Sequence, residues 1–569
     1  MIKSLLQKLV RIFWFLPGFL LWASFPPMGE KMDVYFALAP LLWFSRNKAP
    51  GASFRLWFLN GMLFWVGTLS WMPAIIKNGG PWPLVVLGWG LLSAYCALYF
   101  GVFGWLSSKA WAWTKVRGYG WRVASLLIVE PILWAGLEII RSRLGGGFSW
   151  NQLGVAPVNA GFGSPAALGG VYLVSAMVVL INGTIASIAE RMLEPLMAVR
   201  RRRLELAGGT VNMQNGDGEG TFAPSVPRWA RSVETILPFA LVWCVYGVSG
   251  RFVEYCVAER EAVGQRLSVA LVQRNFPCVF KAATANERPR DVYNRLLAGV
   301  APLKPDLIVL PESAFAEFGE FFGSARAASA AEWLMRTGRA KALIAGGSRE
   351  EGGKLYNSAA LYSTSGEGVP ASVQVYDKAH LVPFGEYIPG DKLFPVLQSL
   401  APVGSCTPGE LKLLRTGEPG VELGVAICYE DTDSAQMRDL AKMGARALAF
   451  ITNDSWFSES QETVQHSWQA VARSIETGLP VIRVGNSGVT GVITPDGNAS
   501  WLSGPDRRPL VDESGVMSDV VVWFPHPRIW MPYGWLGDIP IFMSFLLLIG
   551  AMVMVKYTNN HEKRREVSM

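Results

Sequence analysis

The chain has 569 residues, half of them hydrophobic and 23 of them Trp, and its mean hydropathy is +0.25. A chain of this composition is too apolar to be an ordinary soluble enzyme. Its net charge of +7 does not indicate a nucleic-acid partner, because no basic stripe interleaved with aromatic residues occurs between residues 256 and 538.

The apolar residues concentrate between residue 10 and about residue 255, and again near the C-terminal end. At about 20 residues per membrane-spanning helix, they predict about eight spans, near residues 10–26, 33–46, 56–73, 83–107, 123–140, 166–189, 236–255 and 539–556. The second segment is short, and a re-entrant helix is the alternative. We expect the first segment to be retained as an anchor, because no A-x-A-like cleavage site follows it.

Lys and Arg residues are unevenly distributed among the connecting loops. They accumulate on one side of the membrane, which is the cytoplasmic side if the N-terminus is inside. Only a few occur in the short outer loops, namely Lys31, Lys77, Arg141 and Arg143. The pattern explains the positive net charge as membrane topology and attraction to anionic lipid. Glu130 falls inside the fifth predicted span, and we expect it to face the bundle interior, because a carboxylate is costly to expose to lipid.

This pattern divides the chain into three parts. Residues 1–255 form the N-terminal transmembrane helices and include a flexible cytoplasmic linker at 204–225, which is rich in Gly, Asn and acidic residues. Residues 256–538 form an extracytoplasmic domain. Residues 539–569 form a last transmembrane helix with a basic cytoplasmic tail.

Short apolar or β-branched runs follow one another in the middle part, at residues 269–272, 307–310, 343–345, 359–362, 423–427, 447–452, 481–484 and 489–494. Several are separated by segments with helical periodicity, at residues 288–300, 327–337, 434–443 and 463–476. Strands that alternate with helices predict a layered α/β domain with its own core. The apolar character of the strands indicates sheets that are covered on both faces.

Three residues with complementary chemistry follow or adjoin these runs. Glu312 comes after the run at 307–310, Lys378 lies in a conspicuous motif at 376–387, and Cys428 directly follows the run at 423–427. A thiol nucleophile, a carboxylate base and a cation for the oxyanion are what amide or ester chemistry through a thioester requires. Such chemistry needs no cofactor.

Each of the three has a less specific interpretation. A free cysteine is more often a small buried apolar residue, Glu312 could be a helix-capping or surface acid, and a lysine is usually a solvated surface charge. Their joint occurrence favours catalysis. Cys428 would attack as a thiolate beside Lys378, and Glu312 would be the general base, with a pKa raised by burial. Lys378 would hold the oxyanion.

Other residues near these motifs carry weaker predictions. Glu386 would orient Lys378 and Glu430 would act near the thiol, with ordinary ion pairs as the alternative. We expect no metal, because neither His380 nor His466 belongs to a Cys/His cluster with ligand spacing. Candidate lids are residues 315–322 and 394–408, whose apolar residues suit a core equally well. Cys278 and Cys406 would face the oxidising side, and the sequence leaves open whether they pair.

The outer loop after the fifth predicted span is the best candidate for substrate contact on the membrane side. Arg141 or Arg143 would bind a phospholipid phosphate, with Phe148 and Trp150 at the level of the headgroups. Interfacial anchoring without a role in substrate binding is the alternative.

Together these motifs resemble those of the carbon–nitrogen hydrolase (nitrilase) superfamily. The signatures are a Glu after an apolar strand, a Lys in Asp377-Lys378-Ala379-His380-Leu381-Val382-Pro383-Phe384-Gly385-Glu386-Tyr387, and Cys428-Tyr429-Glu430. Over nearly its full length the chain further resembles the apolipoprotein N-acyltransferases. That resemblance is also carried by Gln273, Asn275, Pro277, Asn453-Asp454-Ser455-Trp456-Phe457, Gln465-His466, Arg483 and Asn486-Ser487-Gly488.

The resemblance implies a polytopic α-helical membrane bundle fused to an α/β nitrilase-like αββα sandwich. It implies a Glu312–Lys378–Cys428 triad, with Tyr387, Tyr429 and Trp456 as further substrate-binding candidates. The implied acyl donor is a membrane phospholipid, and the implied acceptor is the N-terminal diacylglyceryl-cysteine of an apolipoprotein. The implied location is a bacterial inner membrane, and we expect a monomer. The alternatives are a membrane-tethered amidase of the same superfamily and, less favoured, a transporter with a ligand-sensing domain.

Overall fold

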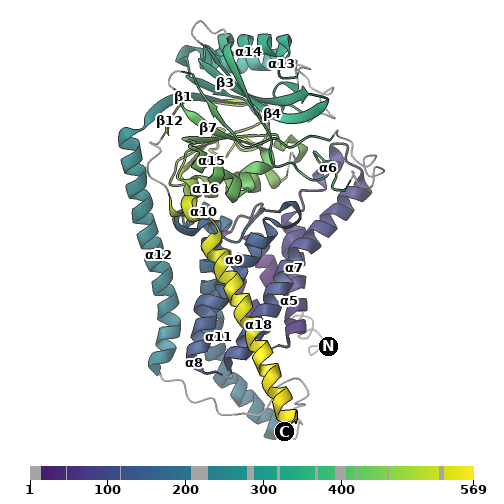
Figure 1. Ribbon diagram of the computed structural model, residues 1–569, viewed down its shortest axis with the longest axis vertical. Helices are drawn as coiled ribbons and strands as arrows, with labels where there is room; N and C mark the ends of the chain where they lie inside the picture. The colour runs from purple at the N-terminus through teal and green to yellow at the C-terminus, as the bar shows by residue number, and fades with distance from the viewer. Residues whose placement is uncertain are drawn as a thin grey trace.

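The computed structural model describes residues 14–46, 48–115, 117–206, 228–277, 287–316, 321–364, 370–390, 405–417, 420–457, 460–524 and 531–568. It has two parts, a helical bundle and a two-sheet domain that lies at one end of the bundle (Figure 1). The chain enters the two-sheet domain from α12 and leaves it into α18, and both of these helices run along the bundle. The fold class predicted from the sequence is confirmed.

The bundle contains helices of very different lengths. They are α2 (Leu16–Ala23), α3 (Val34–Ala37), α4 (Ala39–Ser45), α5 (Pro50–Thr68), α6 (Ala74–Lys77), α7 (Trp82–Lys115), α8 (Tyr119–Ala124), α9 (Glu130–Arg141), α10 (Val155–Asn159), α11 (Ala166–Leu206), α12 (Arg228–Val263), α17 (Pro532–Leu536) and α18 (Ile539–Ser568). A π-helical turn, Ser125–Val129, joins α8 to α9. Most of the linker expected at 204–225 lies outside the described residues.

Four helical stretches within the described residues are long and apolar enough to cross a membrane. They are Trp82–Thr114, Tyr119–Arg141, Ala166–Leu193 and Ser232–Glu259, and Ile539–Met554 is a shorter apolar helix. These four stretches and the shorter helix coincide with the spans predicted near 83–107, 123–140, 166–189, 236–255 and 539–556. The span expected at 56–73 corresponds to α5, and the one expected at 10–26 contains α2 and begins outside the described residues.

The segment expected at 33–46 is a broken helix. Its two pieces, α3 and α4, together are shorter than the membrane core of about 30 Å, because a helix rises only about 1.5 Å per residue. Asn182 of α11 supplies hydrogen bonds at the break: its Oδ1 accepts from the N–H groups of Leu38 and Ala39 at 2.8 and 2.9 Å, and its Nδ2 donates to the carbonyl of Val34 at 2.9 Å. The neighbouring helix thus satisfies backbone groups that the break exposes.

Glu130 faces the bundle interior, as expected. Its Oε2 accepts from Arg46 at 3.1 Å, its Oε1 accepts from Ser107 at 2.8 Å, and both charged side chains are buried. Arg46 also donates to Ser187 and lies over the Trp111 ring at 4.1 Å. Arg46 is therefore a buried ion-pair partner.

We expect Glu130→Ala to destabilise the bundle by about 3–5 kcal/mol, because it leaves the Arg46 guanidinium buried and unpaired. Thermal unfolding of the detergent-solubilised protein measures this loss. The double variant Arg46→Met, Glu130→Met should recover most of it, since no charge then remains buried. As a control, Glu287→Ala removes a surface partner of Arg295 in the two-sheet domain and should change little. Equal unfolding temperatures for wild type and Glu130→Ala would contradict the prediction.

The second part consists of two six-stranded sheets. The first has the order β12-β1-β2-β3-β4-β5 and the second the order β11-β10-β9-β8-β7-β6. The strands are β1 (Gln265–Gln273), β2 (Leu307–Val309), β3 (Ala342–Glu351), β4 (Lys354–Thr364), β5 (Pro370–Asp377), β6 (Leu413–Arg415), β7 (Glu422–Ile427), β8 (Ala447–Thr452), β9 (Val481–Gly485), β10 (Gly491–Ile493), β11 (Ala499–Trp501) and β12 (Gly515–Phe524). In each sheet the central strands, β1 to β3 and β7 to β9, are parallel.

The sheets pack face to face through residues such as Val309 and Ile344 from one and Val425 and Ile451 from the other. Helices α13 (Pro289–Val300) and α14 (Ala325–Gly338) cover the first sheet, and α15 (Ser434–Met443) and α16 (Glu462–Thr477) cover the second. This is the αββα sandwich implied by the resemblance. Because both faces of each sheet are covered, the central strands are continuous apolar runs.

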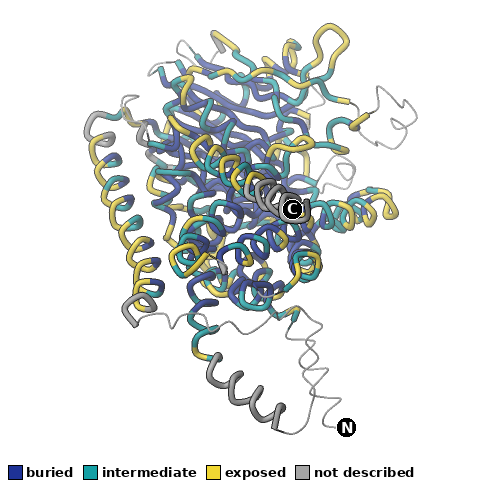
Figure 2. Tube along the Cα trace, turned by 60° about the horizontal axis from the view of Figure 1, so that its bottom comes forward, coloured by how far each residue is buried: buried dark blue, intermediate teal, exposed yellow. Residues whose placement is uncertain are grey.

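Helix α16 lies between the second sheet and the bundle, and nearly all of its residues are buried. Gln465 donates to the carbonyls of Pro26 and Thr68 at 2.9 and 3.2 Å, and Glu476 accepts the N–H of Val171 at 2.7 Å. The middle of the molecule is therefore continuously buried, whereas α12 stands to one side with many exposed residues (Figure 2). These contacts fix the sandwich on the bundle.

Candidate active site

Glu312 lies just beyond the end of β2 in a tightly packed turn. A Cβ on Gly346 of the neighbouring strand β3 would lie 2.5 Å from the Glu312 Cα, so only glycine fits there. The Glu312 carboxylate is buried, and its Oε1 accepts from Asn357 Nδ2 at 2.8 Å. Burial raises its pKa above the ordinary value, although Lys378 and the Asn357 hydrogen bond act in the opposite direction. A raised pKa suits a general base.

Lys378 directly follows β5 and is almost completely buried. Its Nζ lies 3.0 Å from each oxygen of Glu386. Burial opposes its charge, but Glu386, Cys428 and Glu312 outweigh that effect and raise the pKa of Lys378 above its ordinary value. The side chain therefore remains an ammonium, the form that stabilises an oxyanion.

Cys428 follows β7 as the first residue of a 3₁₀ turn, Cys428–Thr432, and has a φ of 54°. A left-handed conformation is uncommon for a non-glycine residue, and such strain concentrates at functional sites. Burial and then the charge of Glu312 raise the pKa of the thiol well above its ordinary value, whereas Lys378 acts to lower it. The resting group is thus a thiol that needs a base to become a nucleophile.

Glu312 and Lys378 both shift the pKa of Cys428, Glu312 and Cys428 both shift that of Lys378, and Lys378 shifts that of Glu312. The structure thus brings together at one place three side chains that are distant in the sequence. This juxtaposition arises because β2, β5 and β7 end at the same edge of the sandwich.

Glu386 occupies the place expected for a residue that orients Lys378. Its Oε2 also accepts the N–H of Val382 at 2.8 Å, and its Oε1 accepts from Asn357 at 2.6 Å. Burial opposes its ionisation, but Lys378 and these hydrogen bonds outweigh it and lower the pKa of Glu386. A permanent carboxylate therefore anchors the ammonium.

Glu430 links the two segments that carry Lys378 and Cys428. Its Oε1 accepts from the Tyr376 hydroxyl at 2.7 Å and from the N–H groups of Ala379 and His380 at 2.8 and 3.0 Å. Its Oε2 accepts the N–H of Ile427 at 2.8 Å. Glu430 thus holds the residues that follow Lys378 against the Cys428–Thr432 turn.

Aromatic residues of the membrane-side loop, residues 142–154 between α9 and α10, pack against the Cys428–Thr432 turn. The Tyr429 ring stacks with Phe148 and Trp150, at centroid distances of 6.3 and 6.5 Å, and its hydroxyl accepts the N–H of Ser149 at 3.1 Å. Trp150 is buried and donates to Gln465 at 2.8 Å. Trp150 is therefore buried between the bundle and the sandwich.

The two arginines of the same loop differ. Arg141 is buried, donates to the carbonyls of Phe148 and Trp150 at 2.8 and 2.9 Å, and lies over the Trp65 ring at 4.8 Å. It thus shapes the loop. Arg143 pairs with Asp538, and about half of its side chain is exposed.

The remaining substrate-binding candidates lie where the bundle meets the sandwich. The Tyr387 hydroxyl is near Gly146 of the membrane-side loop. The Trp456 carbonyl accepts from Asn78 at 2.7 Å.

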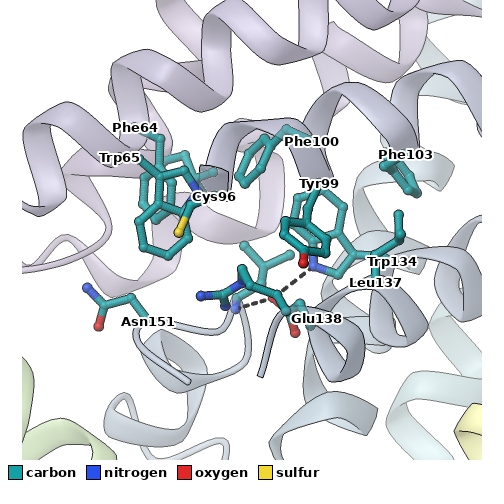
Figure 3. Close-up of a pocket in the computed structure, with 13 residues that line it drawn as sticks. Phe64, Trp65, Cys96, Tyr99, Phe100, Phe103, Trp134, Leu137, Glu138 and Asn151 are labelled. Atoms are coloured by element: carbon teal, nitrogen blue, oxygen red, sulfur yellow. Dashed lines mark hydrogen bonds between the residues drawn. The ribbon is translucent and has the colours of Figure 1, made fainter. Parts of the chain in front are cut away.

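An apolar pocket lies in the bundle beneath this loop (Figure 3). It is lined by Leu21, Phe64, Trp65, Cys96, Tyr99, Phe100, Phe103, Trp134, Leu137, Glu138, Arg141, Asn151 and Leu153. The Trp65 ring contacts Phe148, which stacks on Tyr429. A row of aromatic rings therefore connects the residue after Cys428 with the bundle interior, and the sequence did not predict this pocket.

The structure describes the two candidate lids, residues 315–322 and 394–408, to different extents. Phe315 and Phe322 pack against each other inside the first sheet's core, at 5.1 Å between centroids. Most of 394–408 lies outside the described residues. Cys278 also lies outside the described residues, so the structure does not test whether it pairs with Cys406.

Among the described residues, Asp454, Glu462 and His466 form a buried group with metal-ligand spacing, their donor atoms lying within 4.8 Å of one another. His466 contacts Asp454 at 3.0 Å and Asp431 at 2.9 Å, and Arg483 pairs with the same two carboxylates. Burial opposes the charge of His466, but Asp431 and Asp454 raise its pKa to about 10. A protonated imidazole donates from both nitrogens, here one to each of these two carboxylates.

An αββα sandwich whose strand ends present a carboxylate, an ammonium and a thiol defines an enzyme of the carbon–nitrogen hydrolase type. Residues 268–515 match the family model described as carbon-nitrogen hydrolase, and residues 17–184 match the apolipoprotein N-acyltransferase N-terminal domain. The apolipoprotein N-acyltransferase of Geobacter metallireducens is 32% identical over 515 residues, covering 89% of this chain and 88% of that protein. The chain belongs to the apolipoprotein N-acyltransferase family, and it is an acyltransferase.

The chain also has more distant similarities. The apolipoprotein N-acyltransferase of Shewanella oneidensis is 24% identical, covering 99% of this chain and 98% of that protein. The crystal structure of a carbon-nitrogen hydrolase from Helicobacter pylori is 19% identical, with a TM-score of 0.33, and covers 44% of this chain and 88% of that one. The family predicted from the sequence motifs is confirmed.

Proposed function

We propose that this acyltransferase moves a fatty acyl group from a membrane phospholipid to the α-amine of an apolipoprotein's N-terminal diacylglyceryl-cysteine, through a thioester on Cys428. The observation that carries the proposal is the convergence of Glu312, Lys378 and Cys428 at one edge of the sandwich. Their protonation states are those that thioester chemistry needs before substrate binds: an ammonium, a protonated thiol and a carboxylate of raised pKa.

In the first half-reaction, Glu312 takes the proton of the Cys428 thiol, and the thiolate attacks the ester carbonyl of the phospholipid. The Lys378 ammonium stabilises the oxyanion. The C–O bond then breaks, and the lysophospholipid alkoxide leaves with the proton from Glu312. The product is an acyl thioester on Cys428.

In the second half-reaction, the α-amine of the acceptor attacks the thioester carbonyl, and Glu312 takes a proton from the nitrogen. The C–S bond breaks, the amide is released, and the proton returns to the Cys428 sulfur. The neighbouring aromatic rings of Tyr429, Phe148 and Trp150 would limit access of water to the thioester, which favours transfer over hydrolysis.

The chain carries apolar helices long enough to span a membrane. The finer topology stays part of the proposal: a multi-pass protein of the bacterial inner membrane, acting as a monomer, with residues 256–538 on the extracytoplasmic side. The excess of Lys and Arg in alternate loops supports this orientation. Arg143 is the better placed of the two arginines to meet a donor phosphate, because it is partly exposed, whereas Arg141 already binds two carbonyls.

The experiment is to trap the intermediate. The full-length protein in phospholipid vesicles with a labelled acyl chain should acquire a long-chain adduct on the Cys428 peptide, detected by mass spectrometry. A synthetic diacylglyceryl-cysteine peptide should then discharge the adduct and gain the label as an amide. An adduct that only water removes would instead favour a membrane-tethered amidase, and no adduct on Cys428 would exclude the proposed mechanism.

A further inference from the structure

Asn357 carries no charge, but its side chain contacts two carboxylates of the candidate site and its backbone contacts that of Lys378. It lies on β4, and its Nδ2 donates to Glu312 Oε1 at 2.8 Å and to Glu386 Oε1 at 2.6 Å. Its backbone carbonyl accepts the N–H of Lys378 at 2.8 Å. Asn357 is thus at the centre of the polar contacts around the site.

The chemistry of the amide suits this position. Its NH₂ group has two N–H bonds, one for each carboxylate. Glu312 and Glu386 carry like charges, and Glu386 acts to raise the pKa of Glu312. An amide between them supplies a donor to both without adding a cation that would compete with Lys378.

The hydrogen bond from Asn357 also gives the two carboxylate oxygens of Glu312 different roles. Among the described residues, the hydrogen bond to the Glu312 carboxylate comes from Asn357 and reaches Oε1. Lys378 lies against Glu386 instead, at 3.0 Å from each of its oxygens. The second oxygen of Glu312 is then left to accept the proton of the Cys428 thiol.

We propose that Asn357 is a positioning residue that fixes the Glu312 carboxylate in its proton-accepting orientation and holds it apart from Glu386. The inference rests on the proposed function, because it assumes that Glu312 is the base. Asn357 does not itself touch the reacting atoms. An asparagine with a purely structural role would affect folding but not the ionisation of Glu312.

The test follows thioester formation on Cys428 as a function of pH in Asn357→Ala, Asn357→Asp and wild type. A hydrogen bond to a carboxylate favours its ionised form, so its loss raises the pKa of Glu312. The acid limb of the rate profile should therefore move to higher pH in Asn357→Ala, by about 1–2 pH units for a charge-assisted hydrogen bond. Asn357→Asp keeps the shape but adds a like charge, so its limb should move at least as far.

The matched control is Tyr356→Phe, a change at the neighbouring position of β4, where the ring lies against Arg349; its limb should stay at the wild-type pH. A rate that falls equally at every pH in both Asn357 variants, with an unmoved limb, would overturn the inference while leaving the thioester mechanism intact. Absence of the thioester in wild type would instead overturn the proposed function, and the inference with it.

Discussion

Replacing Cys428 with alanine should abolish both the trapped adduct and the transfer of acyl groups to the acceptor peptide. The nucleophile is the group on which both half-reactions depend, so we expect the rate to fall by about 10⁴-fold or more. Alanine removes only the sulfur, and the chain around position 428 is held by Glu430 through Ile427, Ala379 and His380. The fold should therefore persist, and labelled-lipid transfer in vesicles measures the loss.

Cys244 provides the control for this variant. It is an exposed cysteine of α12, away from the site, and Cys244→Ala should transfer acyl groups at the wild-type rate. If Cys428→Ala inserted into the membrane and still transferred acyl groups, Cys428 would not be the nucleophile. A transporter with a ligand-sensing domain would be the better interpretation in that case.

Replacing Glu312 with glutamine should reduce thioester formation by about 10²–10⁴-fold, the usual contribution of a general base. The wild-type rate should rise with pH through the pKa of Glu312, which burial places above that of an ordinary carboxylic acid. Glutamine cannot accept the proton, so this acid limb should disappear. The remaining rate should rise only as the thiol itself ionises.

The thiol of the Glu312→Gln variant should ionise at a lower pH than in wild type, because the Glu312 charge raises the pKa of Cys428. Glu332→Gln is the control: this surface glutamate of α14 pairs with Arg336, and its loss should leave the profile unchanged. A wild-type acid limb in Glu312→Gln would assign the base to another group, such as Asp454 or Glu386, whose charges also act on the Cys428 thiol.

The buried helix α16 connects the bundle with the turn that carries Cys428. Gln465 binds the bundle and Trp150, and the next residue, His466, belongs to the charged network with Asp431 and Asp454. Asp431 lies in the same turn as Cys428. The Cys428–Thr432 turn is therefore held by contacts that lead to the bundle as well as by its own sheet. These contacts keep the thiol fixed relative to the bundle.

The strands before Glu312 and Cys428 were predictable because each is a local pattern. The runs before Glu312 and Cys428 are apolar on both faces, since the central strands are covered by a helix layer and by the other sheet. Strand β5, which precedes Lys378, was missed: it begins with Pro370 and alternates polar and apolar residues. The short strands β6 and β11 were missed because three residues carry too little pattern.

Other parts of the site were not predictable from local pattern. Asn357 lies inside a strand without a motif, and its partners are 45 and 29 residues away. Trp150 follows a membrane span, where an aromatic residue usually indicates the lipid interface, yet the docked sandwich buries it. Arg141 is the last residue of α9, and it donates to carbonyls of the loop that follows that helix.

The sequence by itself determined the membrane helices, the layered α/β domain and the family, and it predicted the Glu312–Lys378–Cys428 set, because hydropathy, periodicity and short motifs are properties of neighbours along the chain. Only the tertiary structure decided that the pKa of the Cys428 thiol is raised, and it alone decided the linking role of Glu430, the place of Asn357 and the burial of Trp150. These depend on desolvation and on hydrogen bonds between residues far apart in the chain, which exist only once the two sheets and the bundle have packed together.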